Sequence, residues 1–147
     1  MPNIPVYFFS EGIRFSPLHK KKLRLWLQSA AKKEGYSIQT LNYIFCDDNY
    51  LLSINQKYLN HHTLTDIITF DNGGEDPLTE NTVEGDIFIS YERVKENAKK
   101  FGVQAETELK RVMIHGLLHL MGYKDKTLKD KELMRKKEDI YLLKASK

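Results

Sequence analysis

The sequence predicts an α+β fold, a single domain over residues 1–147 in which a mixed four-stranded sheet packs against about five helices. Three observations predict it. Strand-like and helix-like segments are interspersed, no tight turn joins two successive strand segments, and 147 residues is the length of one ordinary domain. With 41% hydrophobic residues the chain can form a core without disulfides, and Cys46 is its only cysteine.

The chain is expected to begin with one strand and one helix. Val6–Phe9 is rich in β-prone residues. A helix is expected to start near Ser16–Pro17, with the serine as N-cap and the proline in the first turn, and to stop at Gly35. Its apolar positions form one broad face: Leu18, Leu23, Leu25, Trp26 and Ala30.

A strand, a helix and two further strands follow. Ile38–Cys46 is strand-like, and Asp47 or Asp48 can cap a helix that continues to Leu59. The next two β-prone segments are Asp66–Phe70 and Gly85–Ser90. The stretch 71–82 between them contains two glycines and a proline and is expected to be a surface loop.

Three helices are expected in the last third of the chain. They are Ser90–Phe101, Glu106–Met121 and Thr127–Ala145, and glycines follow the first two. The middle helix has the clearest apolar face: Leu109, Val112, Met113, Leu117 and Leu120. The last helix is highly charged, and we expect Leu133, Ile140 and Leu143 to face the body of the protein.

The segment HGLLHLMGYKD has the spacing of a metal site. His115 and His119 are four residues apart on the predicted helix, so both imidazoles can reach one ion. Gly122 can take a positive φ and turn the chain back, which would bring Asp125 in as a third ligand. Two histidines and a carboxylate leave a fourth position open, as in catalytic zinc sites. The alternative is a pair of hydrogen-bonded histidines at the end of a buried helix.

The residue after the first histidine limits the chemistry. Zinc peptidases of the H-E-x-x-H type carry a glutamate there as general base, whereas this chain has Gly116. A bound metal lowers the pKa of its water to about 7, so this water can attack a charged substrate such as a phosphodiester without that base.

The same segment, His115–Lys126, resembles the signature H-G-x-L-H-L-x-G-Y-D-H of the YbeY family of single-strand-specific metallo-endoribonucleases. Thr65–Phe70 (TDIITF) is similar to the family's T-D-V-L-S-F stretch, Gly85–Ser90 to its G-D-I strand, and Leu52–Tyr58 to its L-N-x-x-Y helix. The resemblance covers residues 38–125 best. It implies a cytoplasmic enzyme that acts on ribosomal RNA, notably at the 3′ end of the small-subunit RNA, with Zn²⁺ as the cofactor.

The chain departs from the family pattern at two positions. Asp125 stands where the family usually has a third histidine, which adds a negative charge and should make the metal a weaker Lewis acid, more tolerant of ions such as Mn²⁺. Leu59 stands where the family places an arginine at the phosphate, and Lys57, His61 and His62 are the candidates to replace it.

Two more residues have a functional and a structural interpretation. Asp86, among apolar neighbours in a strand, could support a metal-bound histidine or act as a base, or it could cap the following helix. Tyr123 could stack on an RNA base or pack beneath the turn. From Lys124 onward the chain has nine Lys or Arg against five Asp or Glu, which is either a solvated face or an RNA contact.

Several functions remain open from the sequence. The first is a zinc-dependent endoribonuclease, monomeric and cytoplasmic, with single-stranded RNA, ribosomal RNA and the small ribosomal subunit as partners. The others are a small metzincin-like metallopeptidase, a non-catalytic RNA- or ribosome-binding module whose metal only stabilises the helix end, and a mononuclear iron oxygenase. No stretch approaches the roughly 18 apolar residues of a membrane span, and the N-terminus lacks the basic region of a secretory signal.

Overall fold

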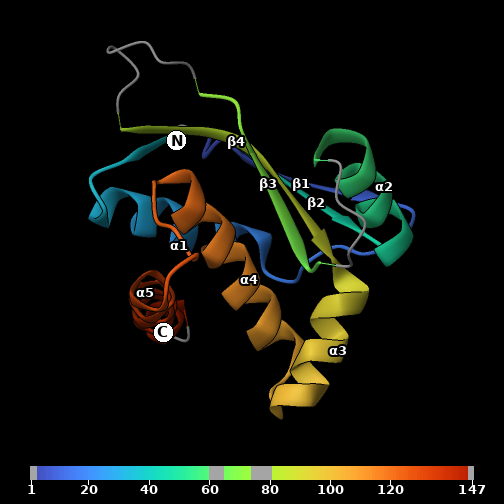
Figure 1. Ribbon diagram of the computed structural model, residues 1–147. Helices are drawn as coiled ribbons and strands as arrows, with labels where there is room; N and C mark the ends of the chain where they lie inside the picture. Colours follow the sequence, from blue (N-terminus) through green and yellow to red (C-terminus); the bar gives the residue numbers. More distant parts are fainter. Residues whose placement is uncertain (1–2, 60–64, 74–80, 146–147) are drawn as a thin grey trace.

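The computed structural model describes residues 3–59, 65–73 and 81–145, and it has the predicted α+β architecture (Figure 1). The elements follow in the order β1 (Val6–Glu11), α1 (Lys20–Lys33), β2 (Ser37–Cys46), α2 (Asp48–Leu59), β3 (Ile67–Asp71), β4 (Thr82–Ser90), α3 (Tyr91–Phe101), α4 (Ala105–Leu120) and α5 (Leu128–Ala145). Among the helices described, none has the length and apolarity that a membrane crossing requires.

The strands form one mixed sheet in the order β1-β2-β4-β3, which confirms the four-stranded prediction. β1, β2 and β4 are parallel, and β3 pairs with β4 in the antiparallel direction at one edge. Hydrogen bonds with short polar side chains begin two of the helices. The Asp47 carboxylate accepts from the Tyr50 amide, and the Ser90 hydroxyl accepts from the Arg93 amide.

Helices cover both faces of the sheet. The larger core lies between one face and helices α1, α3, α4 and α5. Its strand residues with no exposed surface are Val6, Leu41, Tyr43, Phe45, Ile87 and Ile89. α2 covers the other face, where Leu51 packs near Ile68 in a smaller cluster. Because successive strand residues point to opposite faces, neighbours in β4 contribute to different cores.

Two glycines allow α4 to approach the sheet closely. A Cβ on Gly116 of α4 would lie 2.9 Å from Ile67 Cδ1 and 3.0 Å from Ile87 Cδ1. A Cβ on Gly85 of β4 would lie 2.7 Å from the carbonyl oxygen of Phe70 and 2.8 Å from Leu120 Cδ1. The absence of these two side chains therefore sets how deeply α4 lies on β3 and β4 (Figure 1).

The start of the first helix differs from the prediction. α1 begins at Lys20, after His19 in the left-handed conformation, so Ser16 is not its N-cap. The preceding segment packs against the core instead, where the Phe15 ring stacks on Tyr91 with centroids 3.9 Å apart. Leu18 and Leu25 were expected to be buried and are exposed, at 68% and 51% of their surface.

The inward face of α5 also differs. Leu133 and Leu143 are exposed, at 46% and 69%, and the buried residues are Met134, Glu138 and Tyr141. These three have helical spacing, but one of them is a carboxylate. The apolar pattern predicts the wrong inward face because it takes no account of polar contacts. The polar contacts of Glu138 and Tyr141 decide which side of α5 turns inward.

We predict that Gly85→Ala lowers the free energy of unfolding by about 1–3 kcal/mol, since the new methyl group meets a backbone carbonyl that cannot rotate away. Urea denaturation followed by circular dichroism measures this change. Ser37→Ala, at an exposed position of β2, is the control and should change the value by less than about 0.5 kcal/mol. Equal stability of the two variants would contradict the close approach at Gly85.

Candidate metal centre

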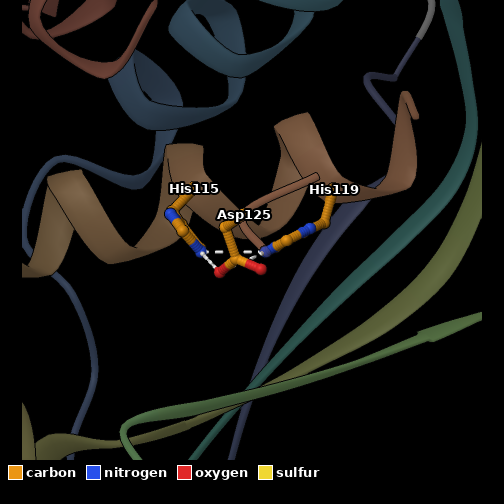
Figure 2. A group of neighbouring side chains, drawn as sticks. All are labelled: His115, His119 and Asp125. Carbon is orange, nitrogen blue, oxygen red and sulfur yellow. Dashed lines mark hydrogen bonds and ion pairs between the residues drawn. The ribbon is translucent and has the colours of Figure 1, made fainter. Parts of the chain in front are cut away.

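His115 and His119 project from the same face of α4 and converge with Asp125 (Figure 2). The Nε2 atoms of the two histidines are 2.9 Å apart. Asp125 Oδ2 lies 3.5 Å from His115 Nε2 and 3.4 Å from His119 Nε2. A tetrahedral zinc ion with bonds of about 2.0–2.1 Å holds its ligand atoms about 3.3 Å apart. The three side chains therefore have the spacing of ligands that could hold one metal ion.

The turn after α4 brings Asp125 back to the helix, as the sequence predicts. Gly122 has φ 100°, its amide donates to the His119 carbonyl, and the Tyr123 amide donates to the Leu118 carbonyl. This pair of hydrogen bonds forms a Schellman motif, which reverses the chain at a helix end. Asp125 then lies against the two histidines rather than one turn further along the axis.

The outer ring nitrogens of both histidines have acceptors as partners. His115 Nδ1 lies 2.6 Å from Glu138 Oε2, and His119 Nδ1 lies 3.0 Å from the Tyr123 carbonyl oxygen. Because a carbonyl and a carboxylate only accept, each Nδ1 carries the proton and each neutral ring has a lone pair on Nε2. Two lone pairs 2.9 Å apart repel unless a cation, either a shared proton or a metal ion, lies between them. The donor set therefore fits a metal ion.

Glu138 is the functional residue that the sequence analysis missed. Glu138 is 5% exposed, and its hydrogen bond with His115 joins α5 to α4. Carboxylates in this position fix the orientation of a ligating imidazole and raise its basicity. The available signal was the helical spacing of this acidic residue from Met134 and Tyr141. That signal could be recognised only once the buried face of α5 was known.

Arg111 compensates the buried charge of Glu138. Its guanidinium donates to Glu138 Oε1 at 3.0 Å and to Asp139 Oδ1 at 2.9 Å. Burial disfavours the charged form of His115, but the hydrogen bond and the charge of Glu138 outweigh this and raise the pKa of the imidazole. The site thus favours a positive species at His115, either a proton or a metal ion.

A second buried carboxylate, that of Glu34 at the end of α1, stabilises the turn between α4 and Asp125. It accepts hydrogen bonds from the hydroxyls of Tyr123 and Tyr141 and from Lys137 Nζ. Burial alone would raise the pKa of Glu34, but these three donors outweigh it and lower the pKa below its ordinary value. α1, the metal-binding turn and α5 are therefore joined at one carboxylate.

The candidate metal site opens into a cavity of about 640 Å³ between three elements. α4 forms the floor, the start of β3 one wall and α5 the other. The lining residues besides the three candidate ligands are Thr65, Asp66, Ile67, Thr69, Glu108, Arg111, Val112, Lys131, Met134, Arg135 and Glu138. Burial raises the pKa of both the Asp66 and the Glu108 carboxyl groups.

The structure separates Asp86 from this site. Ile87 and Gly85 face α4, so Asp86 between them points to the opposite face of the sheet. Its carboxylate accepts from the side-chain amides of Asn42 and Asn72, at 2.9 Å and 3.1 Å. Asp86 therefore does not line the cavity of the candidate metal site, and the cap of α3 is Ser90 rather than Asp86.

The expected substrate residues that the structure describes, Lys57 and Tyr123, do not line the cavity. Lys57 lies on α2, its ammonium over the Tyr58 ring, and does not line the cavity. Tyr123 packs under the turn with its hydroxyl bound to Glu34, as its structural interpretation predicts. His61 and His62 lie outside the described residues, and only the backbone of Leu59 is described.

Gly116 explains the missing glutamate of the peptidase motif. The position faces Ile67 and Ile87 in the sheet, so a glutamate there would collide with the core before it could reach a metal-bound water. This helix therefore offers two candidate metal ligands without a carboxylate base directly after the first of them.

Comparisons with known proteins agree with this geometry. The family model described as Endoribonuclease YbeY matches residues 11–146. A curated Endoribonuclease YbeY of Cytophaga hutchinsonii is 52% identical over 93% of each chain, and one of Flavobacterium psychrophilum is 59% identical over 78% of each.

A solved structure matches as well. The solution structure of a Thermotoga maritima protein superposes with a TM-score of 0.66 at 29% identity, over 95% of this chain and 88% of that one. The shared fold, the signature around His115 and the identity to curated relatives over most of the chain lead to one conclusion. This protein belongs to the YbeY family of endoribonucleases.

Proposed function

We propose that this protein is a zinc-dependent endoribonuclease that cuts single-stranded RNA in the cytoplasm and processes ribosomal RNA at the 3′ end of the small-subunit RNA. The observation that carries the proposal is the convergence of His115, His119 and Asp125 at the floor of an open cavity. The names of the relatives, each an endoribonuclease, support RNA as the substrate.

The side chains around the cavity have separate roles in the proposed reaction. Zinc at the three ligands would lower the pKa of a bound water and polarise a phosphate oxygen. Glu138 and the Tyr123 carbonyl hold the Nδ1 protons, so that both Nε2 lone pairs face the cavity. Asp66 and Glu108 line the same cavity, and burial raises the pKa of both carboxyl groups, which favours the protonated form that a general acid needs.

The geometry disfavours the peptidase alternative. A peptidase of this layout needs a base beside the first histidine, and the packing at Gly116 leaves no room for one. A binding module without catalysis would have no use for an open fourth ligand position. Cleavage assays distinguish these alternatives.

We predict about one zinc ion per chain in freshly purified or zinc-reconstituted protein, measured by elemental analysis. His115→Ala and His119→Ala should abolish loading, because two of three ligands cannot hold the ion tightly. Asp125→Ala should weaken affinity and keep the fold, since Asp125 is in a turn and its side chain is 44% exposed. Asp125→His should keep the metal and increase activity at neutral pH. An unchanged affinity in Asp125→Ala would place the third ligand elsewhere.

We predict that Glu138→Gln weakens zinc affinity by about 10- to 100-fold, because the amide is a weaker acceptor for the His115 Nδ1 proton. Competition with a fluorescent chelator measures the affinity. Asp139→Asn is the matched control, as Asp139 also pairs with Arg111 but does not touch a ligand. If the two variants lose affinity equally, the effect comes from Arg111 rather than from the histidine.

The proposed reaction predicts endonucleolytic cleavage of unpaired RNA, weaker cleavage of duplex RNA and none of casein. A chelator should stop it, and rising salt should slow it as phosphate contacts weaken. His115→Ala purified in the same way controls for contaminating nucleases. RNA cleavage by that variant at the wild-type rate would refute the nuclease, and cleavage of casein by wild type alone would favour the peptidase.

A further inference from the structure

Two cations of α5 stand in the wall of the metal-site cavity. Lys131 and Arg135 are exposed, lie four residues apart and line the cavity together with His115, His119 and Asp125. Side chains with this spacing lie on the same face of a helix, one turn apart. The cavity therefore has a pair of positive charges on its α5 side.

These two cations are not held in ion pairs, although the charge of Arg135 partly offsets the rise in the pKa of Glu108 that burial causes. Within residues 3–59, 65–73 and 81–145, neither side chain takes part in a salt bridge or a hydrogen bond. The other cations near the site are held: Arg111 by Glu138 and Asp139, and Lys137 by Glu34. Unpaired cations beside a reaction centre are available to a negatively charged ligand.

The opposite side of the cavity has the reverse character. Asp66 precedes β3, and Glu108 in the first turns of α4 is only 4% exposed. Among the described residues, neither carboxylate has a hydrogen-bonded side-chain partner, and both face the cavity. A phosphate against this side would be repelled, so an RNA backbone is directed towards α5.

We propose that Lys131 and Arg135 form a phosphate-binding subsite that holds the sugar–phosphate backbone of the RNA strand next to the phosphate at the metal centre. This inference rests on the proposed nuclease function and names how its substrate is held. The same two residues also line a neighbouring hollow of about 480 Å³ on α5, together with Leu128, Glu132, Lys136 and Asp139. Glu132 and Asp139 add negative charge to that hollow, so the phosphate is expected on the cavity side of Lys131 and Arg135.

The test compares the double variant Lys131→Ala/Arg135→Ala with Lys95→Ala/Lys99→Ala. The second pair is also exposed and four residues apart, on α3, and does not line the cavity. Fluorescence anisotropy with a 5′-labelled polyuridylate, whose integrity is checked on a gel, gives the dissociation constant as a function of salt. Cleavage kinetics of the same probe give KM and kcat, and elemental analysis gives the zinc content.

The α5 variant should bind about tenfold more weakly, with a salt slope reduced by about 1.4 if each lost contact contributes about 0.7. KM should rise by a similar factor with kcat and zinc content kept. The charge-preserving variant Lys131→Arg/Arg135→Lys should restore binding, and the α3 variant should stay within about twofold of wild type. Equal losses in the α5 and α3 variants, or none in the α5 variant, would overturn the subsite.

Different results would contradict the proposed subsite and the proposed nuclease function. Wild type that cuts RNA while the α5 variant binds as well as wild type refutes the subsite and leaves the function standing. Wild type that binds polyuridylate through Lys131 and Arg135 without cutting it refutes the nuclease and leaves the subsite. Wild type that neither binds nor cuts overturns both.

Discussion

The hydrogen bond between His115 and the buried carboxylate of Glu138 is the interaction on which the rest of the site depends. It fixes the proton on Nδ1, and so turns the Nε2 lone pair of His115 towards Asp125 and His119. A buried carboxylate is costly without partners, and Arg111 supplies the second one. α5 therefore turns Glu138 inward and leaves Leu133 in solvent, against the preference of an apolar side chain.

The depth of α4 on the sheet is the second constraint. Gly116 and Gly85 remove the side chains that would separate helix from strands, so the imidazoles sit close to the start of β3. The same packing excludes a catalytic glutamate after His115. One steric condition thus positions the ligands and removes the chemistry of the peptidases that share this ligand spacing.

The two carboxylates that support the ligands act at different distances. Glu138 touches a ligand directly, whereas Glu34 acts through Tyr123, whose carbonyl receives the His119 Nδ1 proton and whose hydroxyl binds Glu34. Because Tyr141 and Lys137 bind the same carboxylate, α5 is tied to the site at two points. Beside this inner face, Lys131 and Arg135 of α5 are exposed and line the cavity.

The sequence by itself determined the α+β class, the four strands, the five helices and the three candidate ligands, because these depend on local spacing. His115, His119 and the positive φ of Gly122 follow from one helical turn and one reversal. Asp86 and Tyr123 could not be placed from spacing alone. Which face of β4 meets α4, and what lies under the turn, depend on contacts between distant segments.

The same reason explains what only the tertiary structure decided. The start of α1 depends on Phe15 meeting Tyr91, and the inward face of α5 depends on Glu138 and Tyr141 finding partners on α4 and α1. Hydrophobic periodicity predicts that a carboxylate faces solvent. A carboxylate becomes favourable to bury only when partners from other elements neutralise its charge, and periodicity does not include those partners. The candidate ligands could therefore be predicted from the sequence, and the carboxylates that support them could not.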